Sequence, residues 1–330
     1  MYRAILIPVL LLLLSVPVFG QTRPAPPSPP PPAPGGTIRP RLSDSATGYV
    51  DNAIVGRQIR FRFDAGYGID SPDRAEFFYA KCGCFRFLPS DDPRFDPNAP
   101  GPGSPGDVET NLNYQEFRLD TEFPVHDRVS LTAEIPVRSI DPKVIDRASG
   151  IGDIRVGFKA AAFASEDLYL TAQLRTYIPS GNARRGLGTN HASLEPALLY
   201  HQKFAGQRTA LAGQLGLWHP IKGSAGVPTS SPDRFSGNVL IYGFGGSYDA
   251  VDTPRLRIAP VVEFVGWRVL GGFQTTNGPL RADGTHIVNI KIGARLDTGG
   301  PGSFYAGYGH ALTNARWYED VVRVEYRIAF

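Results

Sequence analysis

The chain has 330 residues, of which 42% are hydrophobic and 20% charged, and its formal net charge at pH 7 is +3. Acids and bases are spread evenly, which excludes the basic surface that a nucleic-acid partner requires. After the first residues there is no apolar run long enough for a membrane helix, so a membrane location would require strands.

The chain begins MYRAILIPVLLLLLSVPVFG, which has the features of a secretory signal peptide. Arg3 precedes a short apolar stretch that is broken by Pro8 and Pro17, and small residues precede an expected cleavage after Gly20. A membrane anchor is the alternative, but the stretch is short for a spanning helix. We therefore expect residues 1–20 to be a signal peptide and the protein to be exported.

Residues 21–48 contain the run TRPAPPSPPPPAPGG, which cannot bury apolar surface and favours an extended polyproline conformation. We expect a Pro-rich periplasmic spacer, and a docking ligand for a partner is the alternative. Residues 49–330 should form one domain, whose length is ordinary for a barrel.

Strict alternation of apolar and polar residues recurs through this domain, as in FRLDTEF, VSLTAEIPV and IVNIKIGARL. A period of two predicts strands. We expect strands at 56–67, 112–124, 128–138, 151–164, 168–179, 192–204, 208–218, 237–249, 255–268, 285–297, 303–310 and 320–330.

Short polar turns alternate with long loops between these strands. This is typical of an outer-membrane barrel with periplasmic turns and external loops. We predict an all-β fold: a closed antiparallel transmembrane β-barrel of about 12 strands, with both termini in the periplasm. The longest loop, 68–111, contains DRAEFFYAKCGCFRF, which we interpret as a hairpin above the membrane. A secreted β-sandwich is the alternative, but it does not explain the alternating loop lengths.

The last segment, EDVVRVEYRIAF, has apolar Val322, Val324, Tyr326 and Ile328 on one face and charges on the other. We expect it to close the cylinder against the first strand near Ile59, because hydrocarbon does not tolerate an unpaired strand edge.

Cys82 and Cys84 form a CGC sequence. A disulfide between residues two apart is strained, and two thiols lack the ligands of a structural zinc site. We interpret them as a strained or reduced pair on the surface, with a redox or metal role as the alternative.

Several segments resemble a known group of proteins. The terminal Phe330, after alternating apolar residues, resembles the C-terminal assembly signal of bacterial outer-membrane barrels. The segments SGIGDIRVGFKAAAF (149–163) and TYIPSGNARRGLGTNHASLEPALLYHQKF (176–204) resemble barrels of the phenol meta-degradation type of putative transporter. The shared motifs are Gly150, Gly152 and Asp153; Pro179, Ser180 and Gly181; and Gly186, Leu187, Gly188 and Thr189. The resemblance implies a Gram-negative outer-membrane barrel that passes small organic molecules, and it carries over no functional residue.

The inward positions of the predicted strands are rich in charge, so the interior should hold water or a network of ion pairs. The predicted pore-lining residues are Arg60, Arg62, Asp64, Glu116, Arg118, Asp120, Glu122, Glu134, Arg155, Lys159, Arg175, Glu195, Arg257, Glu263, Lys291, Arg295, Arg323, Glu325 and Arg327. Their excess of bases favours anions or polar solutes. A salt-bridged, nearly sealed core is the alternative.

Trp218, Trp267 and Trp317 fall near strand ends on the long-loop side, where we expect an external aromatic girdle. Stacking of an aromatic solute at the mouth is the alternative.

We expect no enzymatic activity and no catalytic residue, because no nucleophile and base have a diagnostic spacing. His286 beside Thr285, with Ser236 as a further nucleophile, comes nearest to a catalytic arrangement. We also expect no metal site and no cofactor.

The sequence thus predicts a passive, porin-like outer-membrane channel for small polar or anionic solutes, aromatic ones included. A largely closed barrel with a structural or surface role is the alternative, and a lipid-modifying enzyme is a weaker one. The expected partners are outer-membrane lipid, a small-molecule solute and the barrel-assembly machinery, which would bind the strand that ends at Phe330. We expect a monomer.

Overall fold

The computed structural model describes residues 44–70, 88–92, 95, 97, 109, 111–144, 146–204, 208–221, 236–275 and 279–330. The expected signal peptide, the Pro-rich run, the proposed hairpin of the first loop and the CGC sequence lie outside the described residues.

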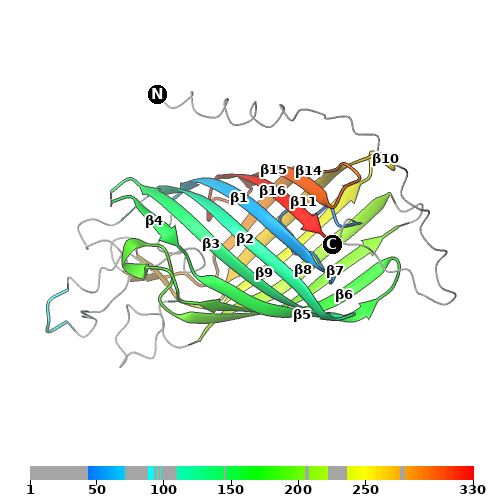
Figure 1. Cartoon of the computed structure of the whole chain (residues 1–330). Helices are drawn as coiled ribbons and strands as arrows, with labels where there is room; N and C mark the ends of the chain where they lie inside the picture. The colour runs from blue at the N-terminus through cyan, green and yellow to red at the C-terminus, as the bar shows by residue number, and fades with distance from the viewer. Residues whose placement is uncertain are drawn as a thin grey trace, which may run out of the picture. The chain divides into compact units, whose positions relative to one another are not determined.

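Twelve antiparallel strands form a closed barrel (Figure 1). They are β1 (Gln58–Ile69), β2 (Leu112–His126), β3 (Val129–Pro142), β5 (Ile154–Ala164), β6 (Leu168–Ile178), β7 (Ala192–Lys203), β8 (Thr209–Ile221), β9 (Val239–Tyr248), β11 (Leu256–Val269), β14 (His286–Asp297), β15 (Gly302–Ala311) and β16 (Asp320–Ala329). Each predicted strand is present, and most bounds differ from the prediction by one to three residues. The predicted fold class is confirmed.

The sheet closes between the first and last strands, where Ile59 pairs with Ile328 and Phe63 pairs with Val324. Every barrel strand therefore has a neighbour on both sides, and the ladder has no free edge. Such closure satisfies the backbone amides that hydrocarbon would otherwise leave unbonded.

Short strands extend the barrel at some of its connections. Before β5, β4 (Ala148–Ile151) continues the pairing along β3, and the break falls at Gly152 and Asp153. A short β10 (Val251–Thr253) pairs with β11, and β12 (Phe273–Thr275) pairs with β13 (Pro279–Arg281) between β11 and β14.

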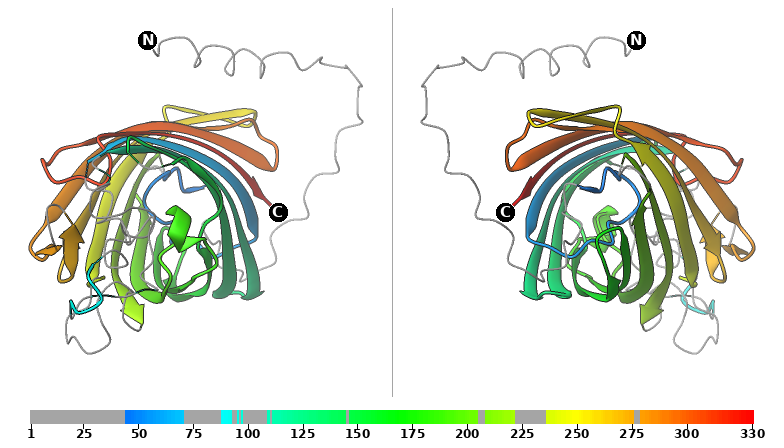
Figure 2. Two further views of the ribbon diagram at one scale, coloured as in Figure 1. Left: turned by 90° about the vertical axis from the view of Figure 1, so that its left-hand side faces the viewer. Right: turned by 90° about the vertical axis from the view of Figure 1, so that its right-hand side faces the viewer.

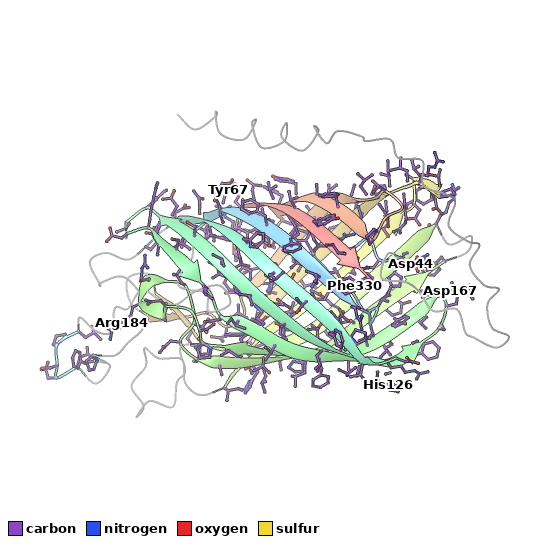
Figure 3. The ribbon with its side chains drawn as sticks, viewed as in Figure 1. Asp44, Tyr67, His126, Asp167, Arg184 and Phe330 are labelled. Carbon is purple, nitrogen blue, oxygen red and sulfur yellow. The ribbon has the colours of Figure 1, made fainter. Side chains whose placement is uncertain are left out.

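The two ends of the barrel differ in their connections. His126 and Asp167 mark the short-turn end, whereas Tyr67 and Arg184 lie towards the opposite, long-loop end (Figure 3). Asp44, where the described part begins, also lies towards the short-turn end.

The outer surface of the strands is apolar. Alternate residues such as Phe61, Phe117, Leu131, Phe244 and Ile292 are exposed, by 39% to 58% of their surface. In a water-soluble protein so many exposed large side chains would favour aggregation, whereas in a bilayer they contact lipid. No helix among the described residues is long and apolar enough to cross a membrane.

Candidate functional site

The barrel interior is occupied by residues 44–57, which we call the plug segment. Figure 2 shows this blue segment inside the ring of strands. It begins at the short-turn end, where Lys203 Nζ contacts Asp44 Oδ1 at 2.8 Å. It returns to the same end, where Gly56 N donates to Glu122 Oε1 at 3.3 Å. The chain therefore enters and leaves the interior on one side before β1 begins.

The wall binds several backbone groups of the plug segment. Arg327 donates to Ser45 O at 3.1 Å, Arg295 to Thr47 O at 2.9 Å and Arg323 to Gly48 O at 2.5 Å. Glu263 accepts from three successive amides, at residues 48, 49 and 50, and the contact to Val50 N measures 2.7 Å. Buried backbone groups need such partners because no sheet ladder pairs them here.

Asp51 anchors the middle of the plug segment. Its Oδ2 lies 2.9 Å from Arg175 Nη2 and accepts from Gln173 at 3.3 Å, while its amide donates to Gln214 at 2.8 Å. Burial alone would raise the pKa of Asp51, but the charge of Arg175 and its hydrogen bond outweigh burial and lower that pKa to about 2. The carboxylate is therefore ionised throughout the ordinary pH range.

Close packing leaves little free space around the plug segment. Gly48 lies against the Tyr305 ring, and a Cβ at this position would come within 2.0 Å of Tyr305 Cζ. Beside Asp51 and Arg60 there is a cavity of about 20 Å³. That volume is close to the minimum for a single water molecule. The plug segment thus fills an interior that 12 strands alone would leave wider than an eight-stranded barrel.

All nineteen residues that we predicted to line the pore are buried or half-buried, on the side of the sheet opposite to the exposed apolar residues. Seventeen of them form ion pairs with one another or with Asp51, Arg138 or Asp249. The other two are Glu263, which binds the plug backbone, and Lys291.

Glu325 shows how dense this network is. Its carboxylate lies 3.1 Å from Arg62, 2.7 Å from Arg295 and 3.4 Å from Arg327. Buried charges of this kind require partners, since an uncompensated charge in a dry site is costly. The ion pairs of the wall thus surround the plug segment and the small cavity beside Asp51.

An apolar layer covers the charged one towards the long-loop end. Trp218, Trp267 and Trp317 are buried there, and the cluster includes Tyr177 and Leu187. Our prediction of an external girdle is wrong for these tryptophans, which are at most 6% exposed. Period two fixes only which residues share a face, and near the strand ends the large inward residues pack with one another and with the loops.

The loop 179–191 folds over the interior at the long-loop end, where its short helix η4 (Ala183–Arg185) is visible in green (Figure 2). Asp153 holds this loop. Its carboxylate accepts from Gly181 N at 3.0 Å and from both the amide and the hydroxyl of Thr189 at 2.8 Å. Ser180 Oγ donates to Gly152 O at 2.9 Å. The three short motifs in the sequence therefore build one clasp that fixes the loop.

The structure places the residues that came nearest to a catalytic arrangement against other partners. His286 Nε2 is hydrogen-bonded to the Tyr242 hydroxyl, and Ser236 forms a backbone bridge with Gly272. Within the described ranges, no group of three or more His, Cys, Asp or Glu side chains is placed to hold a metal ion.

Sequence reasoning missed the plug segment. Ser45 to Gly48, which we had assigned to the spacer, contact the inner wall. The stretch SDSATGYVDNAIVG has no strand or helix period, so only its small residues hinted that it could fit a confined space.

Solved structures with this architecture are outer-membrane barrels. An outer membrane channel from Pseudomonas putida F1 superposes with a TM-score of 0.54 over 86% of this chain and 99% of its own, at 17% identity. The β domain of the Bordetella autotransporter BrkA gives 0.49, over 83% and 100%, at 11% identity. The NanC porin gives 0.43, over 82% and 100%, at 8% identity. No family model matches the sequence, and no curated protein matches it. The chain thus has the fold of an outer-membrane β-barrel.

Proposed function

We propose that this protein is a passive outer-membrane channel whose conductance is controlled by the plug segment. The observation that carries the proposal is the way the wall binds residues 44–57: through polar, mostly backbone contacts beside a water-sized cavity. Polar contacts of this kind can be exchanged for water when the segment withdraws.

Withdrawal of the plug segment would uncover a strongly charged interior. The nineteen wall residues comprise eleven bases and eight acids. The plug segment adds the carboxylates of Asp44 and Asp51, so its departure increases the positive excess. We propose that the open channel favours small anionic solutes. The aromatic layer at the long-loop end supports a preference for solutes that also carry an aromatic ring.

We extend the proposal to the cellular setting: residues 1–20 as a signal peptide, residues 21–43 as a spacer, a Gram-negative outer membrane as the location, and the assembly machinery as partner of the last strand. The assignment to the phenol meta-degradation type of transporter is likewise a proposal. It is supported by the clasp around Asp153, which uses the motif residues of that group.

A largely closed barrel with a structural or surface role is the second candidate. The observation that favours it is the dense packing around the plug segment, where the cavity beside Asp51 has only about 20 Å³. In that case the plug segment would be a permanent part of the core.

Planar-bilayer recording separates the two functions. We would replace residues 44–55 with a Gly/Ser linker of equal length and compare single-channel conductance with that of the unaltered protein. A channel controlled by the plug segment predicts a several-fold larger conductance in the variant.

The control variant carries a Gly/Ser replacement of the Pro-rich run at 24–34, and it should conduct like the unaltered protein. If the 44–55 variant folds, as shown by heat-modifiable mobility on gels, but gives no single-channel steps, the channel proposal fails and the closed barrel is favoured.

A further inference from the structure

The ring of Tyr49, in the plug segment, lies against two cationic side chains of the wall. Arg323 Cζ is 4.1 Å from the ring centroid and Lys291 Nζ is 4.6 Å from it. Tyr305 meets the ring edge to face, with 6.1 Å between the centroids. Cations are attracted to the negative face of an aromatic ring. The wall around Tyr49 therefore has the composition of a site that holds an aromatic ring.

Lys291 also lacks an anion. Its Nζ donates to the Tyr318 hydroxyl at 2.6 Å, and the side chain is only 1% exposed, yet it forms no ion pair among the residues that the structure describes. The two acids whose charges act on Lys291 have other partners while the plug segment is in place. Asp64 contacts Arg323 at 2.7 Å, and Glu263 binds the plug backbone. All the other bases in the predicted set have a carboxylate partner.

The amide side chain of Asn289 lies on the same face of β14 as Lys291. Asn289 precedes it by two residues on β14, so both side chains face the interior. Asn289 is fully buried, and neither polar atom of its side chain has a hydrogen-bond partner within the described part of the chain. Gly309 on β15 leaves the space that the Lys291 side chain occupies, since a Cβ there would lie 2.4 Å from Lys291 Cδ. A polar ligand bound here would supply the hydrogen-bond partner that the buried Asn289 amide needs.

We propose that Tyr49 occupies the binding site of a small aromatic carboxylate. The ring of the ligand would replace the Tyr49 ring between Lys291 and Arg323, and its carboxylate would pair with Lys291 and accept a hydrogen bond from Asn289. Tyr49 is only half-buried, so a solute can compete for its position. Since one site cannot hold both rings, binding of the ligand favours departure of the plug segment. This consequence rests on the proposed channel function, whereas binding itself does not.

Calorimetry on the purified full-length protein in detergent tests the site, with benzoate as the probe. Tyr49→Ala removes the competing ring and should tighten benzoate binding by about tenfold or more. In the variant the Tyr49 ring no longer has to leave the site before benzoate binds. Tyr49→Phe keeps the ring and should bind like the unaltered protein. Lys291→Met, made in the Tyr49→Ala background, should abolish binding.

Two controls separate the site from general loosening of the plug segment. Ile54→Ala removes a side chain of the same segment that is buried in a separate apolar cluster with Tyr169 and Leu199. By loosening the segment it should also tighten benzoate binding, and Lys291→Met made in the Ile54→Ala background should abolish that binding. Cyclohexanecarboxylate lacks the aromatic ring and benzyl alcohol lacks the charge. Both should bind much more weakly than benzoate.

The proposal is overturned if Tyr49→Ala does not tighten benzoate binding, or if Lys291→Met has no effect on that binding in either background. It is also overturned if either control compound binds as well as benzoate. Tight benzoate binding by a protein that conducts no current would instead support the site and contradict the channel function, so the two failures are distinguishable.

Discussion

At the scale of single residues, Asp51 links the plug segment to the wall through Arg175. Asp51→Asn removes a hydrogen bond between charged groups, which should favour plug release by about 1–3 kcal/mol. The open population should then rise by roughly 5- to 150-fold. Asp141→Asn, which removes an exposed ion pair with Arg147, is the matched control and should change little. Open probability in planar bilayers measures both, and equal behaviour of the two variants would contradict this role of Asp51.

The same residue predicts how the channel responds to pH. The folded pKa of Asp51, about 2, lies below the ordinary Asp pKa of 3.8. The ionic contribution of Asp51 is therefore complete above about pH 3.8 and is lost only as pH falls towards 2. Because Asp51 does not titrate between about pH 8 and pH 5, we expect its contact with Arg175 to hold the plug segment equally well across this range. The frequency of channel opening in a bilayer recording should therefore be constant there. A steep rise in opening across this range would show that another group holds the plug segment.

At the scale of elements, Asp153 fixes the loop 179–191 over the interior. Asp153→Ala leaves two backbone amides without their acceptor, so the loop should open locally at lower cost. Arg184 and Arg185 are exposed in this loop and offer trypsin a cleavage site. We expect cleavage there to be about tenfold faster in the variant. Asp167→Ala at the short-turn end is the control, and equal cleavage rates in the two variants would contradict the role of the clasp.

The elements also show what the sequence could predict. Apolar and polar residues alternate along each barrel strand, and the alternation stops at the turns, so the strands could be located. Closure of the first strand on the last follows from the cost of a free strand edge in hydrocarbon. The final register, with Ile59 opposite Ile328, is close to the expected one. The inward position of Arg323 and Glu325 also follows from alternation, because each lies between outward apolar residues.

The plug segment and the aromatic layer were not predictable in the same way. Residues 44–57 have no period, since their backbone is paired by side chains such as Glu263 and Arg295 from distant strands. Trp218 could be placed near a strand end, but whether it faces lipid or the interior depends on the loops that fold over it. Long-range contacts of this kind leave no local pattern.

At the scale of the whole molecule, a lipid-facing barrel encloses a salt-bridged wall, and a segment of its own chain fills the remaining space. The nineteen predicted pore-lining residues carry a net charge of +3, and Asp44 and Asp51 of the plug segment offset part of that excess. The segment thus contributes both to the width and to the charge of the path.

The reversal potential in a potassium chloride gradient tests this account most directly. With residues 44–55 replaced by the Gly/Ser linker, we predict larger single-channel currents and a reversal potential shifted towards that of chloride, relative to the unaltered protein. A variant that folds but passes no current, or whose current is carried mainly by potassium, would contradict the account.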